Sequence, residues 1–230
     1  RRVGLAGYRR RELRCLPSRK SDAGRCDRNR GRRLRTFDAE FINWATPHVA
    51  DFAFPAHPEL YSQVILRMTI GCPGLPGDCD PWDRYAWLRL EEDLAGGGTR
   101  DVEIARFITP YDITGGSYPG TCEWLFDVSD YKFLLKDTQT LKLYIESWMG
   151  NARGWLITCD FAFVHGASAL QPFAVTNLYL DDWIVYGDSP LAHEAELPAV
   201  LVDVPVDAAA AKLRMTTTGH GFGFAENCAE

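Results

Sequence analysis

Several common sequence signatures are missing from this 230-residue chain. It contains no C-x-x-C pair, which weakens a zinc-ribbon or a thioredoxin interpretation. No run of about 18 apolar residues occurs, so the sequence predicts no transmembrane helix. Its five histidines show no H-x-H spacing, which argues against a copper monooxygenase built on a β-sandwich. From residue 36 onward, hydrophobic residues do not recur at the 3.6-residue spacing that amphipathic helices require.

Acidic residues are scarce in one part of the chain only. Residues 1–35 hold 14 Lys and Arg against three acids, a net charge of +11, whereas residues 36–230 hold 11 against 28, a net charge of −17. The basic stretch has neither the apolar segment of a secretory signal nor a hydrophobic period. We therefore expect it to be disordered, or foreign to the protein, and to make no contact with the folded domain. The acidic remainder argues against nucleic-acid binding.

Two of the seven cysteines lie close together. Cys72 and Cys79 enclose a loop with two Gly and two Pro residues, the composition of a turn closed by a disulfide. Because disulfides persist in oxidising compartments, the pair predicts a secreted or periplasmic protein. The sequence leaves the pairing of Cys122, Cys159 and Cys228 open.

Short alternating segments, separated by turns rich in Gly and Pro, dominate from residue 36 onward. This pattern predicts an antiparallel β-sandwich or jelly roll with one helical turn at 130–136. The expected strands are 61–70, 84–91, 102–109, 123–128, 141–148 and 155–165. A second β-rich stretch starts near residue 175 and includes 199–206. We place the domain boundary in the patternless stretch before it, which gives domains at 36–170 and 171–230.

Three acids lie at the end of the cysteine loop or just after it, in the segment GDCDPWDRY. Crowded carboxylates can act as general acids or bases, although turns also collect Asp. Asp78 and Asp80 are interpreted as turn residues. Asp83 lies between Trp82 and Arg84 where a strand begins, which places Asp83 at the rim of the sheet.

A further carboxylate lies in the segment LKLYIESW. Strand periodicity directs Leu141, Leu143 and Ile145 toward the core and places Glu146 and Trp148 on the outer face. An acid among aromatic side chains is either part of a solvated sheet surface or part of a sugar-contacting strip. Spacing alone does not separate the two.

The end of the chain contains three glycines around one histidine. Gly219, Gly221 and Gly223 lack the spacing and the Lys of a phosphate-binding loop, so they predict tight turns. His220 has no second ligand at metal spacing and predicts no metal site.

Four motifs resemble, in order and spacing, the N-terminal domain of the peptide-N-glycosidase F family: CDPWDRYAWLRL, EIARFITPY, LKLYIESW and FAFVHG. The resemblance covers roughly residues 37–166. It is thinner after residue 172, where LRMTTTGHGFG and NCAE resemble part of the second domain. It implies two eight-stranded antiparallel jelly rolls, the second incomplete here, with the active site between them. Neither a metal nor an organic cofactor belongs to the family.

The resemblance also implies site residues: catalytic carboxylates at Asp83, Glu146 and Glu230, and substrate contacts at Arg84, Trp148, Trp82 and His220. His220 stands where the family has a tryptophan. In this scheme Asp83 activates or orients water, and Glu230 assists proton transfer or holds the water. Glu146 binds sugar hydroxyls or tunes the basicity of Asp83, and Arg84 keeps Asp83 ionised and donates to the glycan.

The implied activity is hydrolysis of the amide between an asparagine side chain and its glycan, on glycopeptides or glycoproteins, by a monomer. We expect little activity from this chain because much of the second domain is missing. Two alternatives remain open: a two-carboxylate glycosidase, which leaves Asn rather than Asp, and a non-catalytic glycan-binding module.

Overall fold

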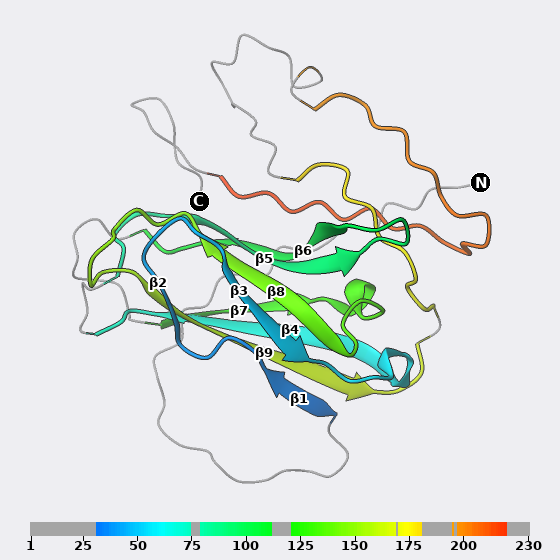
Figure 1. Cartoon of the computed structure of the whole chain (residues 1–230), viewed down its shortest axis with the longest axis horizontal. Helices are drawn as coiled ribbons and strands as arrows, with labels where there is room; N and C mark the ends of the chain where they lie inside the picture. Colours follow the sequence, from blue (N-terminus) through cyan, green and yellow to red (C-terminus); the bar gives the residue numbers. More distant parts are fainter. Residues whose placement is uncertain are drawn as a thin grey trace. The chain divides into compact units, whose positions relative to one another are not determined.

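The computed structural model describes residues 31–74, 79–111, 121–168, 170–180, 195 and 197–219. Among these, residues 31–175 and 217–219 belong to one compact unit and residues 176–216 to another. The described strands all lie in the first unit (Figure 1). No helix in the described ranges is long and apolar enough to cross a membrane.

The first unit is a sandwich of two antiparallel sheets (Figure 1). One sheet has the order β1 (Arg32–Arg35), β9 (Trp155–His165), β4 (Tyr61–Gly71) and β7 (Thr121–Asp127), and β2 (Glu40–Ile42) also pairs with β9. The other has the order β3 (His48–Ala53), β8 (Thr138–Ile145), β5 (Tyr85–Asp93) and β6 (Thr99–Ile108). Two short 3-10 helices, η1 (Pro58–Leu60) and η2 (Ser129–Tyr131), lie in the connections. The predicted all-β sandwich is therefore confirmed.

Alternating side chains from both sheets fill the core. In β8, Leu141, Leu143 and Ile145 are fully buried, as the period of two predicted. In β4, Leu66 and Met68 are equally buried. Burying each aliphatic side chain of this size contributes about 1.5–3 kcal/mol, so these rows are a main source of the stability of the sandwich.

The six expected strands are present with slightly shifted ends, but β1, β2 and β3 were not predicted. β1 falls inside the basic stretch that was expected to make no contact with the domain. Its Arg32 pairs with Phe163 of β9, and Arg35 pairs with Asp160 both through the backbone ladder and through its side chain at 2.8 Å. The expectation is therefore wrong for residues 32–35. Basic side chains suit this position because β1 is an edge strand and needs few apolar residues.

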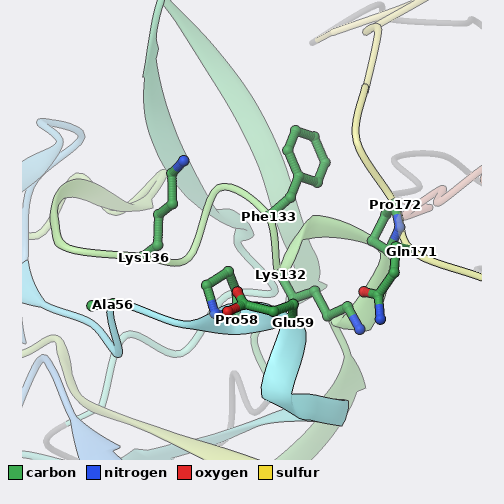
Figure 2. Close-up of a pocket in the computed structure, with 8 residues that line it drawn as sticks. All are labelled: Ala56, Pro58, Glu59, Lys132, Phe133, Lys136, Gln171 and Pro172. Atoms are coloured by element: carbon green, nitrogen blue, oxygen red, sulfur yellow. The ribbon is translucent and has the colours of Figure 1, made fainter. Parts of the chain in front are cut away.

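The helical turn expected at 130–136 is the 3-10 helix η2 followed by further turns. It carries the chain past a buried Lys132, whose Nζ donates to the backbone carbonyl of Tyr61 at 2.8 Å. Burial lowers the pKa of Lys132. A cavity of about 270 Å³ adjoins this lysine and is also lined by Glu59, Lys136 and Gln171 (Figure 2).

Two cysteine thiols lie in the core. Cys122 of β7 pairs with Ile70 of β4, and Cys159 of β9 pairs with Met68, so β4 runs between the two cysteines. Two strand spacings separate them by about 10 Å, which exceeds the reach of a disulfide, roughly 7 Å between Cα atoms. Cys122 and Cys159 therefore do not pair with each other. Burial, with a smaller effect of Asp160, raises the pKa of Cys159, so its thiol is unreactive.

The described part of the second unit has no strand, although residues 199–206 were expected to be β-rich. Leu201 and Val206 are fully exposed. An extended segment becomes a strand only when a neighbouring strand satisfies its backbone hydrogen bonds, and no described strand pairs with residues 199–206. The second jelly roll remains a prediction.

Candidate active site

The ends of several strands meet at one end of the sandwich. Gly71 at the end of β4 pairs with Leu156 near the start of β9. In the other sheet, Tyr85 at the start of β5 pairs with Ile108 at the end of β6. The connections 72–84, 109–120 and 146–154 therefore leave the sheets at this end, although their parts 75–78 and 112–120 lie outside the described residues. Loops held by a rigid scaffold commonly carry functional side chains.

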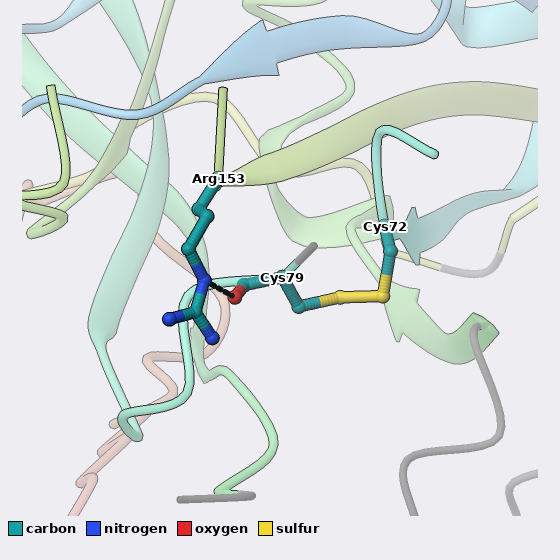
Figure 3. The surroundings of a disulfide bond; sticks show 3 residues. All are labelled: Cys72, Cys79 and Arg153. Carbon is teal, nitrogen blue, oxygen red and sulfur yellow. Dashed lines mark hydrogen bonds between the residues drawn. A yellow bond between two sulfur atoms is a disulfide. The ribbon is translucent and has the colours of Figure 1, made fainter. Parts of the chain in front are cut away.

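A disulfide between Cys72 and Cys79 closes the first of these connections, as predicted. Figure 3 shows Arg153, from the connection between β8 and β9, with its Nε donating to the carbonyl oxygen of Cys79 at 3.2 Å. The disulfide closes the connection between β4 and β5 on itself, and the Arg153 contact joins it to the connection between β8 and β9. Asp78, inside the disulfide loop, lies outside the described residues.

Asp80 follows the disulfide directly and exposes only 1% of its surface. Its Oδ1 accepts hydrogen bonds from the backbone N–H of Trp82 at 3.1 Å and from Arg84 Nη2 at 3.2 Å. Its Oδ2 accepts from Arg84 Nε at 2.7 Å and from Ser147 Oγ at 2.8 Å. The Trp82 contact is the one expected of a turn residue. The burial and the bidentate ion pair are not, so the interpretation of Asp80 as a simple turn residue is incomplete.

The short segment that carries Asp83 is fixed on both sides. Thr109, just after β6, accepts at Oγ1 from the backbone N–H of Arg84 at 2.7 Å and donates from Oγ1 to the carbonyl of Trp82 at 3.0 Å. The N–H of Thr109 donates to the carbonyl of Arg84 at 2.9 Å. Asp83 is half-buried between Trp82 and Arg84. Contacts to Asp80 and Thr109 fix both of these flanking residues, so the backbone at Asp83 is pre-organised.

Glu146 is the first residue after β8 and is half-buried. Its N–H donates to the carbonyl of Tyr85 at 2.9 Å, which places Glu146 beside the start of β5, a point two residues along the chain from Asp83. The next residue, Ser147, is fully buried and binds Asp80. One carboxylate thus binds the immediate neighbours of both predicted catalytic acids, Arg84 beside Asp83 and Ser147 beside Glu146.

The geometry adds a partner for Arg84. Its guanidinium forms an ion pair with the buried Asp80 carboxylate, where little water competes for the cation. The role expected for Arg84 at Asp83 stays a prediction. Arg84 is still partly exposed, with 20% of its side chain accessible, and can meet a ligand.

Aromatic side chains border this end of the sandwich. Trp82 is exposed and meets Tyr111 edge to face with ring centroids 6.1 Å apart. Trp148 is exposed and meets Trp44 edge to face at 5.4 Å. The predicted substrate-contacting residues Trp82 and Trp148 are thus both accessible, whereas Trp44 was not found from the sequence.

The remaining predicted site residues, His220 and Glu230, lie outside the described residues, as does Cys228. Their roles stay predictions. Within the described ranges, no group of three or more His, Cys, Asp and Glu side chains is placed to hold a metal ion.

No protein-family model matches the chain. A curated relative, peptide-N(4)-(N-acetyl-beta-D-glucosaminyl)asparagine amidase F from Elizabethkingia miricola, is 33% identical over 175 residues, which are 74% of this chain and 46% of the relative. The chain thus spans about half the length of that relative.

Two solved structures are similar to part of this chain. A recombinant peptide:N-glycanase F is 29% identical, superposes with a TM-score of 0.50, and the match covers 61% of this chain and 43% of the other. PNGase F from Flavobacterium meningosepticum, described as a glycosylasparaginase, is 28% identical with a TM-score of 0.47 over 60% and 43% of the two chains.

Proposed function

The chain belongs to the peptide-N-glycosidase F family, and on that premise we propose that it is an amidase acting on N-glycosylated asparagine. The products are a peptide with Asp at the former glycosylation site and a glycosylamine. The substrates are N-glycosylated peptides or glycoproteins. Because the chain spans less than half of the relative, its activity is a proposal about the whole protein.

The strand order supports a jelly roll in the first unit. If β1 and β2, which both pair with β9, count as one interrupted strand, the two sheets have four strands each. Consecutive strands then alternate between the sheets in several places: β3 and β4, β4 and β5, β6 and β7, β7 and β8, and β8 and β9. Eight strands that cross repeatedly between two sheets are the arrangement of a jelly roll.

The observation that carries the proposal is the placement of two acids by a third. Asp80 is buried and fixes Arg84 and Ser147, so Asp83 and Glu146 are held at adjacent strand ends. Catalysis of a difficult hydrolysis depends on such pre-organised positions, because small displacements of a reacting group cost large factors in rate.

In the proposed mechanism, Asp83 acts as the general base. Its carboxylate takes a proton from water while the water oxygen attacks the carbonyl carbon of the asparagine side chain. The carbon–nitrogen bond then breaks, and the nitrogen leaves with the sugar after receiving that proton. Glu146 binds sugar hydroxyls, Glu230 assists proton transfer, and His220 contacts the substrate.

We also propose that the protein acts in an oxidising compartment, as a secreted or periplasmic enzyme. The disulfide between Cys72 and Cys79 supports this, because such bonds persist outside reducing cytosol.

The test is Asp83→Asn in the whole protein, assayed on a glycopeptide in ¹⁸O-labelled water. The substitution keeps size and removes basicity, so we expect a loss of at least about 100-fold in rate with retained folding. Asp93→Asn is the matched control, because Asp93 is exposed at the far end of β5. The unmutated protein should place one ¹⁸O in a new Asp side chain.

Other products would identify other functions. An Asn that still bears one sugar, with ¹⁸O on the released glycan, would identify a glycosidase. Binding of the glycopeptide without turnover would identify a glycan-binding module. Full activity of Asp83→Asn would remove Asp83 from the mechanism.

A further inference from the structure

Two exposed tryptophans lie beside the candidate active site, and Trp44 is not among the residues that the family resemblance assigned. Trp148 is 54% exposed and Trp44 is 46% exposed. Their rings meet edge to face, with centroids 5.4 Å apart and planes inclined by 78°. Large apolar side chains that contact each other while exposed to water mark binding surfaces on soluble proteins.

Trp44 is held in place by the neighbouring connection. The N–H of Gly150 donates to the carbonyl of Asn43 at 2.9 Å, and Asn43 Nδ2 donates to the carbonyl of Asn151 at 2.7 Å. Gly150 packs against the Trp44 ring so closely that an added Cβ would come within 3.3 Å of ring atom Cζ3. Its φ of +61° also favours glycine. A ring fixed in this way loses little conformational entropy when a ligand stacks on it.

The two rings continue from the predicted catalytic segment. Glu146, Ser147 and Trp148 are consecutive, so the Cα of Trp148 lies at most about 7 Å from that of Glu146. Trp44 lies next to Trp148, with the two ring centroids 5.4 Å apart. A pyranose ring has an apolar C–H face and hydroxyls at its rim, which matches the flat indole face with its one N–H donor.

We propose that Trp44 and Trp148 form a single aromatic surface for the glycan, on which Trp44 receives a sugar beyond the one that contacts Trp148. This inference rests on the proposed function, because a substrate sugar is placed at Trp148 by that proposal. Trp44 is then a determinant of how many sugars of the glycan the site binds, separate from the carboxylates that act on the amide.

The test measures binding of N-acetylglucosamine and of its β1,4-linked dimer and trimer to the 230-residue chain by NMR titration. We expect Trp44→Ala to leave the Kd for the monosaccharide within about twofold and to weaken the oligosaccharides about tenfold, the loss expected for one stacking contact. Trp44→Phe should recover most of the affinity. Trp148→Ala should weaken all three sugars, and Leu125→Ala, a similarly exposed residue of β7, should change none.

Several outcomes would overturn the inference. Equal weakening of the monosaccharide and the oligosaccharides by Trp44→Ala would mean that Trp44 only supports Trp148. Unchanged oligosaccharide affinity, or no binding by the unmutated chain, would remove the sugar site. The same Trp44 dependence for an unglycosylated peptide would assign the surface to the peptide.

Two features keep the test decisive. If Trp44→Ala does not fold, the unmutated chain can be used instead. We then expect saturation transfer from the Trp44 indole protons to the second sugar of the dimer, and its absence would contradict the inference. Because free sugars are used, failure of the Asp83 experiment leaves this result intact. Conversely, a Trp44 variant with unchanged binding leaves the amidase proposal intact.

Discussion

At each end of the sandwich, the described residues include one buried charged side chain, and the two charges are satisfied in different ways. At the candidate active site, the Asp80 carboxylate accepts four hydrogen bonds from Trp82, Arg84 and Ser147, including a bidentate ion pair. At the other end, the Lys132 ammonium donates to the backbone carbonyl of Tyr61. The first charge is balanced by a cation, whereas burial lowers the pKa of the second.

This difference shows which end is built to hold a fixed geometry. A buried charge with an ion-pair partner and further hydrogen bonds specifies one arrangement of the groups around it. A buried charge bonded to one carbonyl specifies much less, and an apolar side chain of similar shape could replace it. Precision is therefore concentrated at the end that carries Asp83 and Glu146.

The largest effect should come from breaking the Asp80 contacts. Asp80→Asn removes the charge that Arg84 pairs with and offers an N–H₂ where an acceptor is needed. We expect a destabilisation of about 3 kcal/mol, the lower end for one partner of a buried pair, because Arg84 is partly exposed. Urea denaturation measures it, with Asp93→Asn as the control.

A second measurement separates this effect from a general loss of stability. Hydrogen exchange should accelerate in residues 80–84 and 146–148 before the core strands respond. The double variant Asp80→Asn with Arg84→Met should be less destabilised than the sum of the two single variants. Strict additivity would show that the ion pair contributes nothing.

The disulfide at the same end should have the next largest effect. Cys72→Ser with Cys79→Ser opens an eight-residue loop, which should cost about 2.5 kcal/mol on the chain-entropy estimate. We expect the β4–β5 connection to become mobile and Arg153 to lose its contact with the Cys79 carbonyl. Thermal denaturation of the variant against the oxidised protein measures the cost. Equal melting temperatures would show that contacts other than the disulfide hold the loop closed.

The fold was predictable where a strand has a buried face. β4, β8 and β9 alternate apolar and polar residues because one face packs on the core, and their positions agreed with the sequence. β1 and β3 were missed because neither has a fully buried residue, so their sequences show no buried face. An edge strand can form because its partner strand offers backbone groups that need hydrogen bonds. Arg32–Arg35 is extended because it pairs with β9 in this way.

The sequence named residues that lie at this end of the sandwich, but it did not show their contacts. The resemblance supplied Asp83 and Glu146, and the loop composition supplied the disulfide. Asp80 was missed because its burial depends on Ser147, which is 67 residues away. One local signal was available: Asp80 and Arg84 are four residues apart, directly after a cysteine that fixes the chain. A half-exposed Trp44 gives no such signal, because its partner and its support come from another connection.

The smallest effect is expected at the opposite end, from Lys132→Met. Removing the ammonium relieves a desolvated charge, which offsets the cost of leaving the Tyr61 carbonyl unpaired, about 1–3 kcal/mol. At neutral pH we therefore expect the variant to lie within about 1 kcal/mol of the unmutated protein. Urea denaturation at several pH values measures the difference between the two proteins.

The pH dependence of that difference has a definite sign. Burial lowers the pKa of Lys132 in the folded state from its usual 10.5, so between the two values the unfolded chain binds more protons than the folded one. The stability of the unmutated protein should thus rise relative to Lys132→Met as the pH increases through this window. The pKa of Lys142 is raised by Asp101 and Glu91, so its contribution is lost as pH rises, but it is common to both proteins and cancels. If the free energies of unfolding of the two proteins differed by more than about 3 kcal/mol and the difference did not vary with pH, the hydrogen bonds of Lys132 would satisfy its charge as fully as those of Asp80 do.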